Sequence, residues 1–226
     1  MLRSLVGSEM CIRDRSALET HRANGHEPEA IEILFSTHSI PTSMADVSGP
    51  RHTWEKGSGG WYVAQHEAAI EYVMARVREE LGAAHTPENY RLVYQSRSGA
   101  PHVPWLEPDI NDVIDELEGR SAVVVVPIGF VTDHVEVVWD LDTEAKKTAE
   151  DKGLAFVRVA TSGSDDRFIG ALADLVQEAV TPGFERQAMI DLPGALENEK
   201  RTGDCGLECC LCLLYTSDAA DEGLGV

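Results

Sequence analysis

The apolar run AVVVVPIGF, residues 122–130, constrains the fold of this chain more than any other feature. It is rich in β-branched residues and much shorter than the roughly 20 residues that a membrane-spanning helix needs. A continuous apolar run of this length is typical of a parallel strand that is covered on both faces. Because parallel strands are joined by crossover segments that are usually helices, the run predicts a layered α/β domain.

Strand and helix patterns alternate four times along the chain. Strands are expected over residues 30–39, 91–96, 122–130 and 154–160, and helices over residues 61–82, 108–117, 133–152 and 164–180. This order predicts an α/β fold with a four-stranded parallel sheet, flanking helices and right-handed crossovers. The predicted domain covers residues 16–181, and a polar tail follows over residues 182–211.

Composition and missing motifs exclude several classes of function. The chain has 226 residues and a formal net charge of -20, and this acidic balance disfavours nucleic acid as a partner. No apolar run is long enough to predict a membrane span. Neither a phosphate-binding glycine motif nor a G-x-S-x-G nucleophile motif is present. The five cysteines lie near the two ends, which argues against a distributed disulfide framework and for a cytoplasmic protein.

The two ends of the chain differ from the rest. SLVGSEMCIRDR (residues 4–15) and CLLYTSDAADE (residues 212–222) resemble translated sequencing adapters, and back-translation of both gives parts of one inverted DNA element. We therefore expect residues 1–15 and 212–226 to be adapter-derived. Residues 16–211 are then expected to be a fragment of a longer protein, cut at both ends.

Several polar residues follow the predicted strands, and in a parallel sheet ligands gather at the carboxyl ends of strands. His38, Ser96, Arg97, Trp105 and the start of the helix over 133–152 should share this edge. A histidine there could accept protons near neutral pH or bind a metal such as Fe²⁺, or it could be an ordinary surface residue. Trp105 could form an apolar wall for a flat ligand, or it could serve only loop packing.

Three carboxylates, Glu136, Asp140 and Glu144, are spaced four residues apart. On an α-helix they share one face over about 12 Å. We call them the acidic ladder. The buried face of the helix is expected roughly opposite the ladder, at Val135, Val138, Ala145 and Ala149. This pattern fits a solvated face as well as a path for metal ions, and the spacing leaves both interpretations open.

Three segments together resemble a known family. FSTHSIP (35–41), VYQSRSGAPHVPWLEPDI (93–110) and PIGFVTDHVEVVWDLDTEA (127–145) resemble, in order and spacing, the signature segments of ferrochelatase, and the actinobacterial type is the most similar. The chain resembles the C-terminal half of a ferrochelatase. Members of that family fold into two Rossmann-like chelatase domains, with the tetrapyrrole bound between them. The resemblance implies that Fe²⁺ is inserted into a porphyrin in haem synthesis. Coproporphyrin III is the expected substrate, and protoporphyrin IX is the alternative substrate.

The resemblance also implies roles for single residues. His38 matches the active-site histidine and Glu136 its partner carboxylate, and both would contact the metal as well. Asp140 and Glu144 match acidic residues that lead outward, while Ser96, Arg97 and Trp105 would bind the porphyrin. The N-terminal domain of the same chain, expected to be missing here, would supply the other walls of the cleft, so this fragment alone should be inactive.

The tail segment DCGLECC, residues 204–210, resembles the cysteine-rich end of actinobacterial ferrochelatases that hold a [2Fe-2S] cluster. Cys205, Cys209 and Cys210 are the candidate ligands, and a further ligand would come from upstream. Free thiols or a zinc site are the alternatives. For the whole protein, the alternatives to an iron chelatase are a cobalt or nickel chelatase and a non-catalytic module that binds porphyrin or metal.

Overall fold

The computed structural model describes residues 15–49, 56–163 and 165–181. Its four strands form one parallel sheet with the order β2-β1-β3-β4, which confirms the predicted fold class. The strands are β1 Ile31–His38, β2 Tyr90–Gln95, β3 Ala122–Val126 and β4 Ala155–Arg158. β3 is shorter than the apolar run that predicted it, because Pro127 has no backbone N–H to continue the ladder of hydrogen bonds.

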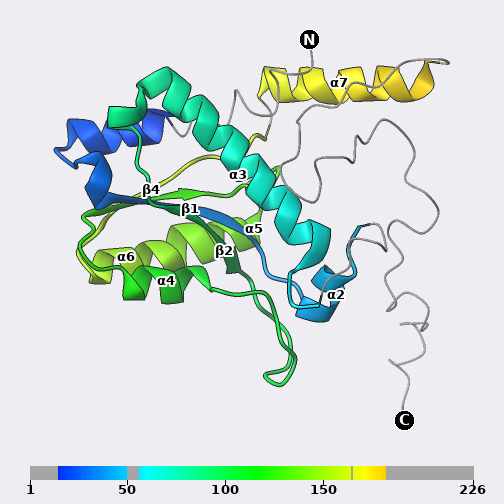
Figure 1. Cartoon of the computed structure of the whole chain (residues 1–226), viewed down its shortest axis with the longest axis horizontal. Helices are drawn as coiled ribbons and strands as arrows, with labels where there is room; N and C mark the ends of the chain where they lie inside the picture. The colour runs from blue at the N-terminus through cyan, green and yellow to red at the C-terminus, as the bar shows by residue number, and fades with distance from the viewer. Residues whose placement is uncertain (1–14, 50–55, 164, 182–226) are drawn as a thin grey trace.

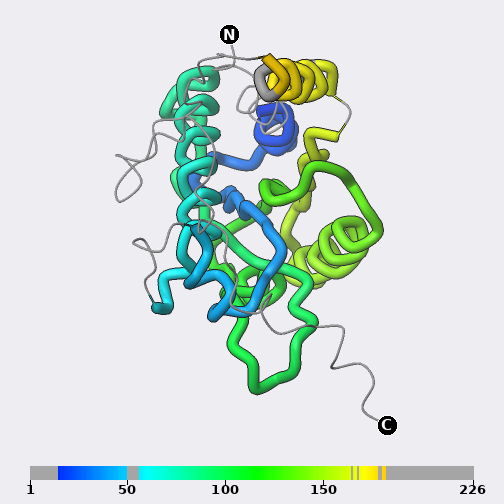
Figure 2. The backbone as a smooth tube through the Cα atoms, turned by 90° about the vertical axis from the view of Figure 1, so that its right-hand side faces the viewer, coloured from blue at the N-terminus to red at the C-terminus, as the bar shows by residue number. Residues whose placement is uncertain are grey.

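Helices cover both faces of the sheet (Figures 1 and 2). They are α2 Thr42–Asp46, α3 Gly60–Leu81, α4 Ile110–Glu116, α5 Val135–Val137, the π-helical segment η5 Val138–Ala145, α6 Lys146–Asp151 and α7 Asp166–Val180, with short 3-10 turns η2 Pro28–Ala30 and η4 Ala83–His85; residues 15–23 are also helical. In the described part of the chain, no helix has the length and apolarity needed to cross a membrane.

Alternation of side chains along β1 divides the core into two halves. Ile33 and Phe35 pack on one face of the sheet with α3 and the helix over 15–23. Leu34 points to the other face, where it packs with α4 and with the helix formed by α5, η5 and α6. All three side chains are buried, as expected for a strand in the middle of a layered α/β domain.

The helix predicted over 133–152 exists, but its middle is π-helical. Its buried row is Val137, Leu141, Ala145 and Ala149. The predictions for Ala145 and Ala149 are confirmed, whereas those for Val135 and Val138 are wrong, since the two valines are 84% and 41% exposed. A π turn holds more residues than an α turn, so η5 rotates the first turn of the helix relative to the last.

Because of this rotation, residues four positions apart lie along one line parallel to the helix axis. The acidic ladder therefore runs beside the buried row rather than opposite it. Arg158 of β4 fixes the helix in this orientation. Its guanidinium donates to both carboxylate oxygens of Asp142, at 2.8 and 2.7 Å, and to Asp133 at 2.8 Å. A bidentate pair of this kind is directional, so it holds η5 at a defined position against the sheet.

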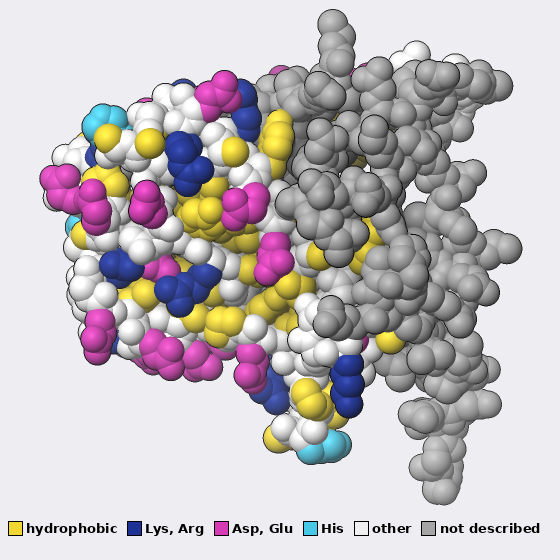
Figure 3. Space-filling model, in the orientation of Figure 1, with side chains coloured by type: hydrophobic (Ala, Val, Ile, Leu, Met, Phe, Trp, Pro, Cys, Tyr) yellow, Lys and Arg dark blue, Asp and Glu magenta, His cyan; other side chains and the backbone are white. Residues whose placement is uncertain are grey.

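On the face shown in Figure 3, acidic side chains are interspersed with lysines and arginines. The acidic surplus of the chain therefore does not gather into one large patch on that face.

Candidate functional site

His38 and Glu136 meet at the carboxyl edge of the sheet. His38 ends β1, and Glu136 lies in the first turn of the helix that follows β3. The imidazole Nε2 lies 2.9 Å from Oε1 of Glu136, and the two side chains are 37% and 42% exposed. The structure thus brings these two side chains into contact, in a position that solvent reaches.

The hydrogen-bond partners of His38 define where its protons lie. Nδ1 lies against the carbonyl oxygen of Ser39, which can only accept, so Nδ1 carries a proton and donates it. Nε2 is then the nitrogen that gains or loses a proton, and it faces the carboxylate. A proton bound at Nε2 would be stabilised by the carboxylate, so the two side chains form one proton-holding pair.

Asp140, the second member of the ladder, is tied to the end of β2. Its Oδ2 accepts hydrogen bonds from the hydroxyl of Ser96 and, at 3.3 Å, from the amide of Gln95. Gln95 in turn accepts at Oε1 from Ser36 at 2.6 Å. Ser96 adopts a left-handed backbone conformation, with φ of 63°, which is uncommon outside glycine and turns its hydroxyl toward the helix. Both bonds reach the same oxygen, so Oδ1 takes part in neither.

The ladder is a row of separate carboxylates rather than a closed metal site. Glu136 and Asp140 are half-buried, while Glu144 is exposed. Within residues 15–49, 56–163 and 165–181, no three His, Cys, Asp or Glu side chains come together closely enough to hold a metal ion. The predicted metal residues His38, Glu136, Asp140 and Glu144 are thus brought onto one side of the domain without forming one centre.

Arg97 and Trp105 belong to a long loop that follows β2 and projects from the sheet in Figure 1. Arg97 lies toward its own loop: it contacts the carbonyl oxygens of Pro101 and Val103 at 3.5 and 3.4 Å, and the carboxylate of Glu107 at 3.6 Å. Trp105 packs over Gly99, where an added Cβ would lie 2.1 Å from the indole nitrogen. The backbone of Trp105 pairs with that of Pro41, which places this loop beside the segment after His38.

Three residues that the sequence did not single out lie directly behind His38. Tyr62 of α3 donates its hydroxyl proton to the carbonyl oxygen of His38 at 2.7 Å. Thr37 lies 3.0 Å from the Tyr62 hydroxyl and 3.0 Å from Nε2 of His66. Burial raises the pKa of Tyr62 and lowers that of His66, so the phenol and the imidazole both stay neutral. Tyr62 and His66 lie on a face of α3 whose sequence pattern indicates only ordinary packing. No motif in the sequence singles them out as functional residues.

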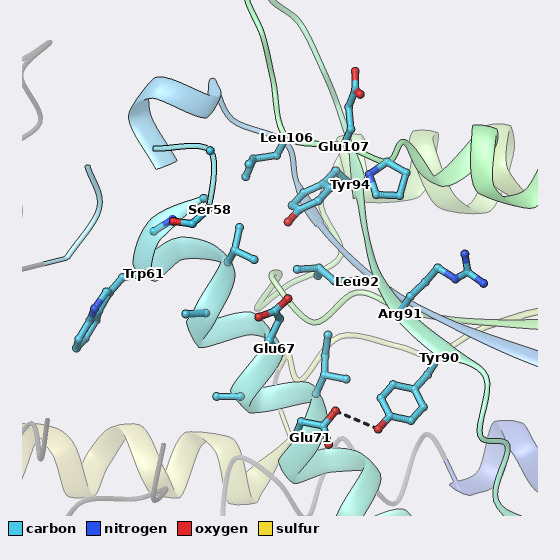
Figure 4. A pocket seen from close by; sticks show the side chains of 18 residues that line it. Ser58, Trp61, Glu67, Glu71, Tyr90, Arg91, Leu92, Tyr94, Leu106 and Glu107 are labelled. Atoms are coloured by element: carbon cyan, nitrogen blue, oxygen red, sulfur yellow. Dashed lines mark hydrogen bonds between the residues drawn. The ribbon is translucent and has the colours of Figure 1, made fainter. Parts of the chain in front are cut away.

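A large hollow in the described part of the chain lies elsewhere. It is a groove of about 910 Å³ between α3 and the edge strand β2. Figure 4 shows Glu67 and Glu71 of α3 facing Tyr90 and Tyr94 of β2 across it, and Tyr90 donates to Glu71 at 3.0 Å. His38 and Glu136 do not line this groove. The proton-holding pair therefore lies outside it.

The cysteine prediction falls on residues that the structure does not describe. Cys205, Cys209 and Cys210 lie in the range 182–226, outside the described residues. Most of the two segments expected to be adapter-derived also lies outside them. These expectations stay predictions.

Acid should weaken the fold through two histidines, the buried His21 and the partly buried His66. Burial lowers the pKa of His21 and of His66, so below about pH 6.5 the unfolded chain binds protons that the folded chain does not. We expect the free energy of unfolding, measured by urea titration, to fall from about pH 7 to about pH 5. H66Q should show a smaller fall, and H85Q, at an exposed histidine, the wild-type fall. An equal fall in H66Q and wild type would contradict this assignment.

Known proteins match this chain over nearly the whole of the described domain. A family model described as Ferrochelatase matches residues 10–180. The chain is 43% identical over 196 residues to the coproporphyrin III ferrochelatase of Tropheryma whipplei strain Twist, which covers 82% of this chain and 49% of that protein. It is 54% identical over 152 residues to the one from Streptomyces coelicolor, covering 66% and 39%, and 49% identical over 203 residues to the one from Leifsonia xyli, covering 83% and 49%.

The chain thus spans about half the length of these relatives. The family model covers all four strands of the sheet, together with His38, Glu136 and the rest of the acidic ladder. A match of this extent, supported by identities of 43–54%, assigns the domain: the chain belongs to the ferrochelatase family.

Proposed function

We propose that the protein extended to the full length of its relatives, hereafter the full-length protein, inserts Fe²⁺ into coproporphyrin III in haem synthesis. Family membership and the names of the relatives support this reaction and this substrate. The observation that carries the proposal is the contact of His38 with Glu136 at the carboxyl edge of the sheet. Ligands of open α/β sheets bind at that edge.

The chemistry of metal insertion matches this pair. A porphyrin that takes up Fe²⁺ loses two pyrrole N–H protons, and the iron keeps its oxidation state. In the proposed reaction, Nε2 of His38 accepts a pyrrole proton, and Glu136 stabilises the imidazolium that forms. Because both side chains are partly exposed, the pair then releases the proton to water and accepts the second one in the same position.

The acidic ladder would deliver the metal. Carboxylate oxygens suit a divalent cation such as Fe²⁺, and neighbours one helical turn apart let the ion exchange its water ligands a few at a time. In this proposal Oδ1 of Asp140 takes the ion while Ser96 and Gln95 hold Oδ2 in place. Glu144, which is exposed, is the entry point from solvent.

The loop after β2 would form part of the porphyrin wall. Trp105 is held beside the segment after His38, which suits an aromatic contact with a flat macrocycle. Arg97 stiffens that loop through its contacts with Pro101 and Val103, and Ser96 orients Asp140. We propose Trp105 as the direct porphyrin contact, with Ser96 and Arg97 shaping the same wall.

The function is tested with the full-length protein under anaerobic conditions. Purified enzyme is mixed with Fe²⁺ and either coproporphyrin III or protoporphyrin IX, and product formation is followed by absorbance. The proposal predicts turnover with Fe²⁺ and a preference for coproporphyrin III. Faster insertion of Co²⁺ or Ni²⁺ would point to a different chelatase, and porphyrin binding without turnover would point to a non-catalytic module.

The ladder makes a separate prediction. In the full-length protein, D140N combined with E144Q should raise the KM for Fe²⁺ by about tenfold or more, because loss of groups around a metal typically costs that much. The KM for porphyrin should stay nearly constant. E150Q, which removes an exposed carboxylate further along the same helix, is the matched control. If E150Q raises the KM for Fe²⁺ as much as the double variant does, the effect reflects overall charge and the path is disproved.

The cysteines of the tail supply a further proposal. We propose that Cys205, Cys209 and Cys210 contribute ligands to a [2Fe-2S] cluster of the full-length protein, because the tail segment resembles the cysteine-rich end of cluster-binding ferrochelatases. Anaerobically purified protein should then contain two irons and two sulfides per chain, with visible absorption that C209S abolishes. A chain that binds zinc instead would refute the cluster.

A further inference from the structure

His38 lacks the packing that usually fixes a reactive side chain. Its imidazole is 37% exposed, and its two ring nitrogens contact only the carboxylate of Glu136 and the carbonyl oxygen of Ser39 among the contacts described. The orientation of the ring therefore depends on the backbone of His38 and Ser39. This backbone is at the end of β1, where the sheet ladder stops.

Three side chains hold that backbone from behind. Nδ1 of His66 donates to the carbonyl oxygen of Tyr62 at 2.6 Å, so the neutral ring can only accept at Nε2. The hydroxyl of Thr37 must then donate to His66, at 3.0 Å. The Tyr62 hydroxyl is left to donate, and its shorter contact, at 2.7 Å, is with the carbonyl oxygen of His38. The protons of Thr37 and Tyr62 thus go to His66 and to the His38 carbonyl, and the two hydroxyl oxygens lie 3.0 Å apart between them.

The loop after β3 packs against two of these side chains, Thr37 and His66. A Cβ added at Gly129 would lie 2.0 Å from Oγ1 of Thr37 and 3.1 Å from Nε2 of His66, so the backbone of this loop is in direct contact with both. The N–H of Gly129 also donates to the carbonyl oxygen of Ser36 at 3.3 Å. Glu136 follows seven residues later on the same segment. The contacts thus join the segment that carries His38 to the segment that carries Glu136.

We propose that Tyr62, held in place by Thr37 and His66, is a positioning residue that sets the imidazole of His38 against Glu136. It touches neither reacting group and acts through the main chain of His38. The kinetic part of this inference rests on the proposed function, while its structural part does not. Removal of the Tyr62 hydroxyl should free the His38 carbonyl and let the ring leave its single orientation.

The structural arm uses the 226-residue chain labelled with ¹⁵N-histidine. The His38 ring signals are assigned by their loss in H38A. In wild type they should show one ring orientation with Nδ1 held against the Ser39 carbonyl, seen as a single set of signals, whereas Y62F should show averaged signals. T37V should act like Y62F, and T37S, which keeps the hydroxyl, should restore the wild-type spectrum. Y90F, which removes a tyrosine hydroxyl bonded to Glu71 outside the site, is the matched control.

The kinetic arm uses the full-length protein. Y62F should lower kcat on the order of tenfold and displace its pH profile, with little change in the KM for Fe²⁺, as expected for a displaced base. If wild type does not insert iron but Y62F still averages the His38 signals, the positioning stands and the proposed function fails. If Y62F and T37V both fold and leave the His38 signals and the pH profile unchanged, the positioning role is refuted and the proposed function is unaffected.

Discussion

Replacing His38 by alanine in the full-length protein is expected to lower kcat for Fe²⁺ insertion by about 10²- to 10⁴-fold, the usual contribution of a positioned base. The reason is geometric. Nε2 is the nitrogen of His38 that is directed at Glu136, and the carbonyl of Ser39 keeps the other nitrogen protonated. Without the imidazole, no base lies beside Glu136 to accept a pyrrole proton. Initial rates at saturating porphyrin and Fe²⁺ measure the loss.

A second histidine separates this effect from a general loss of charge or stability. His85 is exposed and lies in η4, beyond the far end of α3. H85A should keep wild-type rates, while H38A should keep the wild-type fold, as judged by circular dichroism. If H38A retains more than about a tenth of wild-type kcat, a value outside the range of general-base contributions, His38 is not the base.

Leu141→Ala should destabilise the domain more than any ladder substitution. Leu141 is fully buried in the π segment, between Asp140 and Asp142, and packs in the core half that contains Leu34, Val123 and Val125. Truncation of a buried leucine to alanine costs about 2–5 kcal/mol of unfolding free energy, because it leaves a cavity. Urea unfolding of the 226-residue chain measures this cost.

The matched control lies on the same helix. Val138 is 41% exposed, so V138A should change the unfolding free energy by about 0.5 kcal/mol or less. L141M, which nearly conserves volume, should cost less than about 1.5 kcal/mol. If V138A and L141A cost the same, the buried row described for this helix is wrong, and with it the placement of the acidic ladder beside the core.

The sequence predicted the sheet because each of its strands is apolar enough to be recognised alone. The run over 122–130 required cover on both faces, and the polar residues that follow strands had to meet at one edge. His38 and Glu136 are 98 positions apart in the chain, yet this argument alone placed them at the same edge. The roles proposed for them come from the family resemblance, and no spacing could have given them.

The phase of the ladder helix could not be predicted in the same way. A regular α-helix places Val135 and Val138 on the buried side, and nothing in the sequence announces a π segment. The segment depends on tertiary bonds: Arg158 of β4 holds Asp142, and Ser96 and Gln95 of the β2 end hold Asp140. The orientation of Arg97 was also not predictable, because it depends on the particular conformation of its own loop, to which the guanidinium bonds.

The hydrogen bond from Tyr62 to the His38 carbonyl could not be predicted from the sequence, for a related reason. A tyrosine and a histidine four residues apart on a helix are compatible with ordinary packing, and only the position of α3 over the end of β1 brings the hydroxyl to the His38 carbonyl. Residues that act on the main chain of another residue leave no periodic or compositional pattern in a single sequence.

We propose that His38 and Glu136 act as one proton-holding unit, and a double-mutant cycle tests this proposal most directly. The rate of Fe²⁺ insertion into coproporphyrin III is measured for full-length wild type, H38A, E136A and the double variant, with protein concentrations matched. If the pair acts as a unit, the double variant should be no slower than the slower single variant. If the two losses multiply, the residues act independently, and the account of this pair is wrong.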